Sequence, residues 1–454
     1  MTRPGIQRRD YGLLGPEGQR ASESGLVSAV WYSPPVSRKR LGELMKKRNG
    51  PALRDTAIWF AALIVSGSVG VWLWGSWLAI VPFAIYGVLY GSAGDSRWHE
   101  CGHGTAFKTR WMNDGVYQIA CFMMLREPRV WRSSHSRHHA DTIIVGRDPE
   151  INSGRPPDFL GLALNLFALK GGVEALGHIV LHATGRLTAE EKSFIAHRWW
   201  PQVYRIARIW LAILLGVIAA CVELHSILPA MLVGLPTFYG GFLTLIFGLT
   251  QHAGLAEDVL DHRLNSRTVY MNPVSRFIYW NMNYHLEHHL FPMVPYHALP
   301  ELHELVKPHC PAPYRSLIAA YREIVPTLWR QGRDPTYCVE RTVPPLGGLG
   351  YQIPSAARPT TLAVSWRLIW ALAGVPLTYA LIVRTVNAVL ARWPHHGDVL
   401  VLALVTALVL CIYTGARSVF GLLSWSTPAR IAICVVYAAI AFFVLSFVGF
   451  ISAF

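Results

Sequence analysis

The chain has 454 residues, of which 52% are hydrophobic and 15% are charged, and it carries a formal net charge of +14. With a mean hydropathy of +0.31, this composition excludes an ordinary soluble enzyme and predicts a multispanning membrane protein. The basic residues flank apolar segments and form no stripe interleaved with aromatic side chains. We therefore interpret them as signals of membrane topology and expect the lipid bilayer, not nucleic acid, as a partner.

Residues 1–50 predict a flexible, basic N-terminal arm. This arm contains no apolar stretch of the kind found in signal peptides, so we expect no cleaved signal peptide. Basic residues are concentrated just before the first apolar segment, whereas the turn around residues 74–77 has none. By the positive-inside rule, the N-terminus is expected on the cytoplasmic side of a cell inner membrane.

Seven segments are long and apolar enough to cross a bilayer, for which about 20 residues are needed. They lie near residues 57–75, 77–94, 209–227, 228–250, 368–391, 399–416 and 431–454. The predicted fold class is therefore all-α, with a four-helix transmembrane body, a cytosolic cap and three extra C-terminal transmembrane helices. Two further apolar segments are too short or too interrupted to span, and are expected to form helices in the membrane interface: 159–169 and 173–182.

A stretch rich in Gly and Pro near residues 344–359 indicates a linker. It separates the predicted membrane domain, residues 51–340, from a C-terminal three-helix transmembrane region, residues 366–454, with the linker at 341–365. The only histidines in the C-terminal region are His395 and His396, in a turn between spans. We predict that this region contributes no catalytic ligand.

Eight histidines fall in three tight clusters with helical spacing, so that each cluster projects its imidazoles from one face of a helix. Neutral imidazole is the commonest side-chain metal ligand, and eight of them exceed the needs of one tetrahedral ion, which favours two metal ions. Two spans lie before the first cluster and two more before the third, so all three clusters share one face of the membrane. The histidines are His99 and His103, then His135, His138 and His139, then His285, His288 and His289.

A centre with many histidines and few carboxylates suits iron that activates dioxygen. Removal of hydrogen from an unactivated alkyl carbon requires such an oxidant, because no acid, base or nucleophile among the side chains can perform it.

The clusters read HECGH at 99–103, HSRHH at 135–139 and HLEHH at 285–289. In this order they resemble the three histidine boxes of the integral-membrane fatty acid desaturase and hydroxylase family, over about residues 50–310. The segment GDSRWHECGHGTAFKTRWMND around the first box is similar to the rhizopine oxygenase and dihydrorhizobitoxine desaturase branch, whose substrates are small amines.

The resemblance implies a membrane-bound, non-haem di-iron oxidoreductase that uses dioxygen and two electrons to desaturate or hydroxylate an alkyl group. It implies that the eight clustered histidines hold two Fe ions, with His252 after the fourth span as a ninth ligand. The first box has three residues between its histidines, and no cytochrome b5 motif HPGG is present, unlike in acyl-CoA desaturases. A separate electron donor, such as a ferredoxin-like protein, is therefore expected, with a lipid or small-molecule substrate.

Side chains near the clusters can orient the imidazoles by accepting their outer N–H groups. The candidates are Asp95, Asp141, Asn283 and Glu287, although an ordinary capping or solvated role is preferred for Glu287. The run from Asp148 to Glu150 fits either role.

Two other function classes are open. HECGH also satisfies the HExxH pattern of zinc metalloproteases, in which Glu100 would be the general base. A metal transporter is a further alternative, although transport sites lie near the bilayer midplane and these clusters lie outside the predicted spans. Within the oxidase interpretation, desaturation and hydroxylation are not distinguished, because both begin with hydrogen abstraction.

Overall fold

The computed structural model describes residues 9–344, which form helices joined by turns and irregular segments, with two isolated β-bridges, Thr268 with Tyr284 and Val269 with Tyr314. The predicted all-α class is confirmed for this part of the chain. Residues 9–68 and 82–344 belong to one compact unit, and residues 69–81 belong to another. The three predicted C-terminal spans lie outside the described residues.

The described part of the N-terminal arm is folded against the loop that follows residue 252. It contains α1 (Pro16–Glu23) and α2 (Arg38–Leu44). Arg9 forms ion pairs with Glu257, at 3.1 Å, and with Asp258. The ring of Trp31 stacks on that of His262 with 4.2 Å between the centroids.

The first two candidate spans form a hairpin, and the second continues directly into the first histidine cluster. The helices of Arg38–Trp72 and Trp77–His103 are each long and apolar enough to cross a membrane. The second helix continues through a π-helical turn without a break, so His99 and His103 lie at its C-terminal end. The elements are α3 (Asn49–Trp72), η1 (Trp77–Ala79), α4 (Ile80–Gly87), η2 (Val88–Ser92) and α5 (Ala93–His103).

The connection to the next span contains the second cluster and a bent pair of helices. Helices α8 and α9 are bent by 77° relative to each other, and only together are they long and apolar enough to cross a membrane, as a broken span or a re-entrant loop would. The sequence predicted two separate short helices at this place. The elements are α6 (Arg110–Met123), α7 (Pro128–Ala140), α8 (Phe159–Asn165), α9 (Leu169–Ala183), α10 (Ala189–Phe194) and η3 (His197–Trp199).

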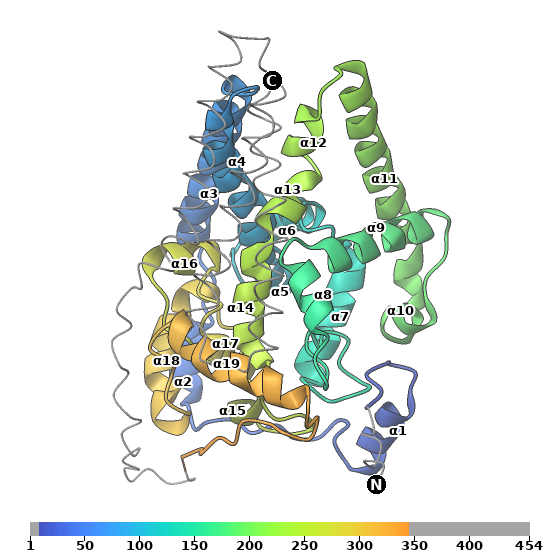
Figure 1. Cartoon of the computed structure of the whole chain (residues 1–454). Coiled ribbons are helices and arrows are strands. Elements are labelled where there is room, and N and C mark those ends of the chain that lie inside the picture. The colour runs from blue at the N-terminus through green and yellow to red at the C-terminus, as the bar shows by residue number, and fades with distance from the viewer. Residues whose placement is uncertain (1–8, 345–454) are drawn as a thin grey trace, which may run out of the picture. The chain divides into compact units, whose positions relative to one another are not determined.

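The third candidate span is α11 (Trp200–Glu223). The predicted span over 228–250 is not confirmed as one long helix, because Pro229, Gly234 and Pro236 interrupt the segment. The chain instead returns from the end of α11 in three short helices, the first of which lies beside α11 (Figure 1). These are α12 (Leu228–Leu232), α13 (Leu235–Gly240) and α14 (Phe242–His252).

Two glycines allow this broken segment to cross the second span at backbone contact. A Cβ atom at Gly240 would lie 1.9 Å from the carbonyl carbon of Gly87, so no side chain fits there. Beside this crossing, the hydroxyl of Ser92 donates to the carbonyl of Gly240 at 2.6 Å. Close approach through small residues is a common way to pack helices in membranes, and it holds α13 and α14 against η2, the turn that leads into α5.

The last described part packs the third cluster against α5. Arg97 on α5 is fully buried, and its guanidinium lies 4.9–5.4 Å from the ring centroids of Trp59, Phe277 and Trp280. It also donates to the carbonyl of Ile278, which joins the first and third clusters through the core. The elements are α15 (His262–Asn265), α16 (Pro273–Ile278), α17 (His285–Leu290), η4 (Tyr296–Ala298), α18 (Leu299–Val306), η5 (Lys307–His309) and α19 (Leu317–Gln331).

Candidate metal centre

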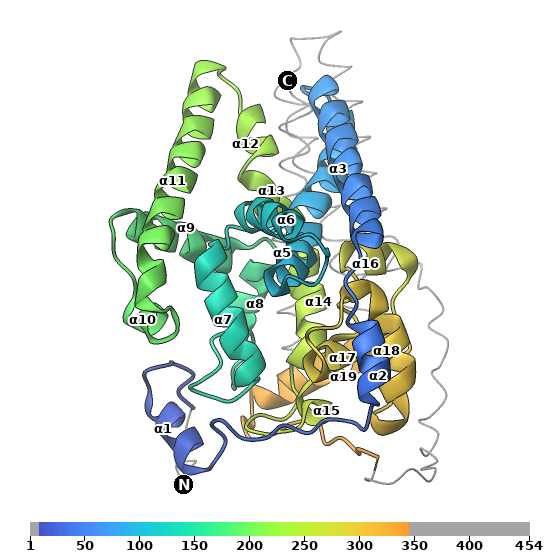
Figure 2. The ribbon, with the colours of Figure 1, turned by 180° about the vertical axis from the view of Figure 1, so that it is seen from behind.

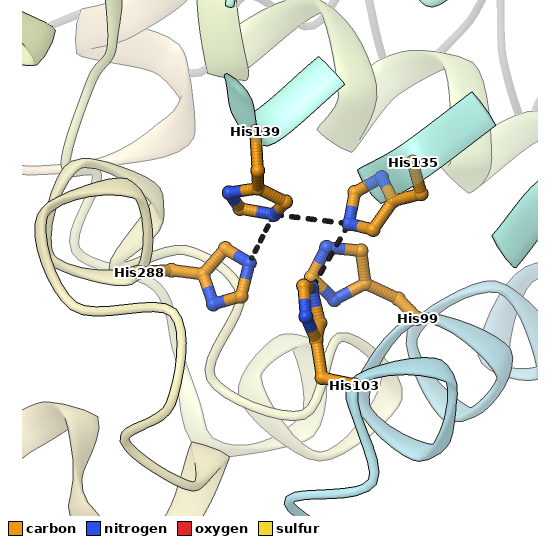
Figure 3. Close-up of side chains that lie close together, drawn as sticks. All are labelled: His99, His103, His135, His139 and His288. Atoms are coloured by element: carbon orange, nitrogen blue, oxygen red, sulfur yellow. Dashed lines mark hydrogen bonds between the residues drawn. The ribbon is translucent and has the colours of Figure 1, made fainter. Parts of the chain in front are cut away.

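Four helices from distant parts of the sequence bring all nine candidate ligands together (Figure 2). Five of these histidines form a first group, drawn in Figure 3, whose ligand atoms all lie within 4.8 Å of one another. Helix α5 supplies two of them, α7 two and α17 one. Successive Nε2 atoms are separated by 3.0 Å, 3.1 Å and 3.1 Å along the series His103, His135, His139, His288. The fifth member is His99.

The other four histidines form a second group: His138, His252, His285 and His289. The Nε2 atom of His285 lies 2.9 Å from that of His252 and 3.0 Å from that of His289. The two groups are adjacent, because the rings of His139 and His289 have centroids 4.5 Å apart. His252, at the end of α14, therefore lies with the residues of the second and third clusters.

The outer nitrogens of several of these imidazoles face hydrogen-bond acceptors. Nδ1 of His135 is 2.9 Å from Oε2 of Glu150, and Nδ1 of His138 is 2.8 Å from Oδ2 of Asp148. Nδ1 of His252 is 2.6 Å from the backbone carbonyl of Asn265. An N–H at each Nδ1 satisfies these acceptors, which leaves a lone pair on each Nε2.

Lone pairs on neighbouring Nε2 atoms 3 Å apart repel one another unless a cation lies between them. Both ring nitrogens of His99, which is 6% exposed, have no hydrogen-bond partner among the described residues. Buried polar nitrogens of this kind are costly unless they bind something. The residues present therefore fit two metal ions, one in each group, with nitrogen ligands of the kind that iron and zinc accept.

The electrostatics of the buried groups favour neutral ligands with anionic supports. Burial lowers the pKa of His139, His285, His288 and His289 well below the usual value for histidine, so these imidazoles are unprotonated and able to bind metal at neutral pH. Burial opposes the ionisation of Glu150, but the neighbouring His135 outweighs it and lowers the pKa of Glu150 to about 2.

None of the four side chains expected to orient the imidazoles is hydrogen-bonded to a candidate ligand among the described residues. Asp95 pairs with Arg126 at 3.0 Å, and Asp141 pairs with Arg147 at 3.0 Å. The amide of Asn283 donates to the carbonyl of Val269. Arginines thus occupy the two aspartates, and the amide N–H of Asn283 is bound to the backbone.

Glu287 also does not orient a ligand, but it is not a solvated residue. It is fully buried, and its carboxylate accepts hydrogen bonds from Thr268 and from Nδ1 of His303, each at 2.6 Å. These bonds join α17, which carries the third cluster, to α18. The orienting carboxylates are instead Asp148 and Glu150, and the hydroxyl of Thr142 lies 3.3 Å from Nδ1 of His289.

Glu100, the general base in the metalloprotease interpretation, is completely buried. One of its carboxylate oxygens accepts hydrogen bonds from the backbone N–H of Tyr296, at 3.1 Å, and from the hydroxyl of Thr105, at 3.0 Å. The other lies 4.0 Å from Nδ1 of His288. Glu100 thus braces the first cluster against the chain that follows the third.

A cavity of about 210 Å³ opens beside the first group. Three candidate ligands, His103, His135 and His139, form part of its wall, so a molecule in this cavity would lie next to the metal centre. Among the described residues that line this cavity, Arg132 is the only Lys or Arg. The other lining residues are Trp98, Gly102, Tyr117, Ser136, Pro292 and Met293.

Comparisons with known proteins agree with this geometry. The sequence profile of the family described as fatty acid desaturase matches residues 75–321, which is more than half of the chain. The chain is 30% identical to the sn-1 oleoyl-lipid 12-desaturase of Anabaena variabilis over 107 residues, covering 22% of this chain and 30% of the relative. It is 29% identical over 243 residues to the Delta(5) fatty acid desaturase fat-4 of Caenorhabditis elegans, covering 46% and 53%.

A third relative is the Delta(12)-oleate desaturase of Trichosanthes kirilowii, 25% identical over 293 residues, which cover 57% of this chain and 76% of the relative. For the first two relatives, the chain spans about half of their length or less. All three histidine clusters lie within the matched segment 75–321.

Proposed function

Because the chain belongs to the fatty acid desaturase family, we propose that it is a membrane-bound oxidoreductase that desaturates or hydroxylates an alkyl C–H bond with dioxygen and two electrons. The observation that carries the proposal is the convergence of nine histidine side chains in two adjacent groups. We assign one iron ion to each group, with His99, His103, His135, His139 and His288 as ligands of the first, and His138, His252, His285 and His289 as ligands of the second.

A di-iron centre held there would supply the oxidising power that no side chain has, by activating dioxygen for hydrogen abstraction. The chain itself orients the imidazoles and excludes water from the centre. Asp148 and Glu150 fix the tautomers of two imidazoles, and the buried setting of His288 and His289 keeps bulk water from their rings. Asp148, Glu150 and Thr142 thus hold the inner nitrogens in position before substrate arrives.

The metalloprotease alternative loses its support. That pattern uses His99 and His103 alone, whereas both lie in a five-histidine group with residues of the other two clusters. Glu100 is buried and already accepts two hydrogen bonds, so it has no access to a peptide bond.

A second candidate concerns the substrate: a compact, charged metabolite, such as an amino-acid-like amine, in place of a lipid acyl chain. Two features support it. The cavity beside the first group has a volume of about 210 Å³, below the roughly 300–1,000 Å³ that is common for sites of drug-sized ligands. Its wall also contains the guanidinium-bearing Arg132, which suits a carboxylate better than a hydrocarbon. The similarity around the first box to rhizopine and rhizobitoxine enzymes is consistent with this candidate.

The remaining assignments follow from the family and the apolar helices. We place the chain in a cell inner membrane with the histidine clusters on the cytoplasmic side, and we assign electron delivery to a separate ferredoxin-like protein. The basic segment before α3 is the evidence for the orientation.

Metabolite and lipid profiling of cells with and without the protein tests the proposal. A compound that loses two hydrogen atoms indicates desaturation, and one that gains an oxygen atom indicates hydroxylation. Cells that produce His288→Ala at the same level in the membrane are the control. Profiles identical between the wild-type protein and this variant, at supplied iron and dioxygen, would contradict the proposed oxidase.

A further inference from the structure

A third cluster of metal-ligating side chains lies away from the two histidine groups. His178 and His182 are one turn apart on α9, and Glu191 is in the first turn of α10. One ligand atom of each lies within 4.8 Å of the others. Nδ1 of His178 is 3.1 Å from Oε1 of Glu191, and Nε2 of His182 is 3.0 Å from Oε2 of the same carboxylate.

The imidazole of His182 lies between two carboxylates. Its Nδ1 contacts Oε2 of Glu127, and its Nε2 faces Glu191. A neutral imidazole has a single N–H and can donate to only one of these carboxylates. The lone pair of the other nitrogen then points at a carboxylate oxygen, so a positive charge must lie between them, as either a proton or a metal ion.

The charge balance of the cluster requires two positive charges. Glu127 and Glu191 are each 4% exposed and His182 is fully buried. Within residues 9–344, the ion pairs of these two carboxylates involve only His178 and His182, and no Lys or Arg. Buried carboxylates without compensation are costly. One divalent cation neutralises both and leaves the imidazoles neutral.

We propose that a divalent metal ion, zinc in the first instance, is bound by Nδ1 of His178, Nε2 of His182 and the carboxylate of Glu191. Two histidines and one carboxylate are a common ligand set for zinc with an open fourth position. The distances between ligand atoms, 3.0–3.1 Å, equal those within the two histidine groups, 2.9–3.1 Å. The side chain of His178 is 49% exposed, so water has access to complete the coordination.

Glu127 gives this site a connection to the second histidine cluster. It is the N-cap residue of α7, the helix that carries His135, His138 and His139. Its contact with Nδ1 of His182 is the outer-sphere bond that carboxylates make to metal-bound histidines. The ion would therefore fix α9 and α10 against the start of α7, and its role is one of positioning.

Zinc binding by the detergent-purified full chain tests the proposal. Zn²⁺ is titrated against a chromophoric chelator for the wild-type protein and His178→Ala, and iron is measured in the same samples. We expect His178→Ala to bind about one zinc fewer per chain and to keep its iron. The matched control is His197→Ala, which removes another exposed histidine and should bind zinc as the wild type does. Equal zinc binding by His178→Ala and the wild type would overturn the site and would indicate that protons on the imidazoles neutralise the two carboxylates.

Two conservative variants keep the proposal testable if His178→Ala perturbs the fold. Glu191→Gln retains the size and hydrogen-bonding capacity of the side chain but should lose the zinc. Glu127→Gln should retain the stoichiometry and weaken the affinity by roughly 10–100-fold. Unchanged zinc affinity in both variants would also overturn the site. Iron content distinguishes this outcome from a failure of the proposed di-iron centre, because none of these residues belongs to the two histidine groups.

Discussion

Oδ2 of Asp148 lies 2.8 Å from Nδ1 of His138, and the same oxygen accepts the backbone N–H of Ile143 at 2.7 Å. The other oxygen, Oδ1, accepts the N–H of Glu150 at 2.8 Å. One carboxylate thus holds the loop after α7 and orients a ligand of the second histidine group. Burial alone would keep His138 unprotonated, but Asp148 outweighs it and raises the pKa of His138, so the imidazole is a strong base and a strong ligand.

The first prediction concerns this support. Asp148→Asn keeps an acceptor for the loop but loses the charge, so we expect the iron affinity of the second group to fall by about 10–100-fold. Iron content after dialysis against graded chelator concentrations measures this change. Asp158→Asn is the control, because Asp158 is exposed and pairs with Lys170 far from the centre. If the two variants retained iron equally, Asp148 would have no orienting role.

The second prediction concerns the ligands themselves. His138→Ala and His288→Ala each remove a buried imidazole from one group, and each should abolish dioxygen-dependent turnover while the protein still inserts into the membrane. Membrane fractionation and oxygen consumption measure the two properties separately. Each variant loses one ligand from one group and should therefore bind about one iron ion fewer per chain.

His395→Ala is the control for this pair. It lies outside the described residues, in the C-terminal region that the sequence predicts to contribute no ligand, and it should turn over normally. Retained activity in His138→Ala or His288→Ala would contradict the ligand assignment, and an inactive His395→Ala would show that the C-terminal spans participate.

The third prediction concerns the glycine contact between the second span and α13. A Cβ atom at Gly240 has no space, because backbone atoms of Gly87 lie 1.9–2.4 Å away. Gly240→Ala should therefore force the helices apart and lower the free energy of unfolding by about 1–3 kcal/mol or more. Thermal unfolding in detergent measures this loss.

Gly216→Ala is its control. Gly216 lies inside α11, and a Cβ atom there would meet nothing within 4 Å. This change should be neutral or stabilising by about 0.4–1 kcal/mol, because alanine restricts the unfolded chain. Similar unfolding temperatures for the two variants would show that the crossing is not as close as described.

The centre was more predictable from sequence than its surroundings. Spacings of three and four residues on a helix force imidazoles onto one face, so the clusters were visible without the fold. The roles of Asp148 and Glu150 stayed open between orienting an imidazole and facing solvent, because they lie on a loop whose course depends on tertiary contacts. Asp95 and Asp141 are nearer in sequence to ligands, but arginines occupy them. Sequence proximity was therefore a poor guide to the hydrogen-bond partners of the imidazoles, even for Asp95, which lies on the same helix as His99.

The fold, too, could be predicted from the sequence only in part. Hydropathy alone predicted the helical class and the first three apolar helices, because burial in lipid requires long apolar runs. It did not reveal the breaks within residues 228–250, because a run broken by Pro229 and Gly234 has the same mean hydropathy as a continuous span. Proline and glycine in the segment were the available signal for the break. The cluster of His178, His182 and Glu191 was missed although the two histidines are one helical turn apart, because Glu191 lies on a separate helix whose position depends on the turn between α9 and α10.

The last prediction tests which substrate class occupies the cavity beside the first histidine group. Arg132 is one-third exposed, its guanidinium lies 4.4 Å from the ring centroid of Tyr117, and its nearest carboxylate is Asp114 at 3.6 Å. The Nε of Arg132 is buried without a partner among the described residues. A substrate carboxylate in the cavity would gain a charged hydrogen bond from this side chain, worth about 1.5–3 kcal/mol.

With the substrate that profiling identifies, Arg132→Gln should then raise KM by about 10–100-fold and change kcat little, because the arginine binds the substrate and does not touch the ligands. Arg129→Gln is the matched control, since Arg129 lies one turn earlier on α7 and contacts Gln202 and Trp199 instead of the cavity. If the substrate is a neutral acyl chain, both variants should have the KM of the wild type. Steady-state kinetics of the two variants thus decides between a substrate with a carboxylate in the cavity and a neutral acyl chain, because only the former uses the charge of Arg132.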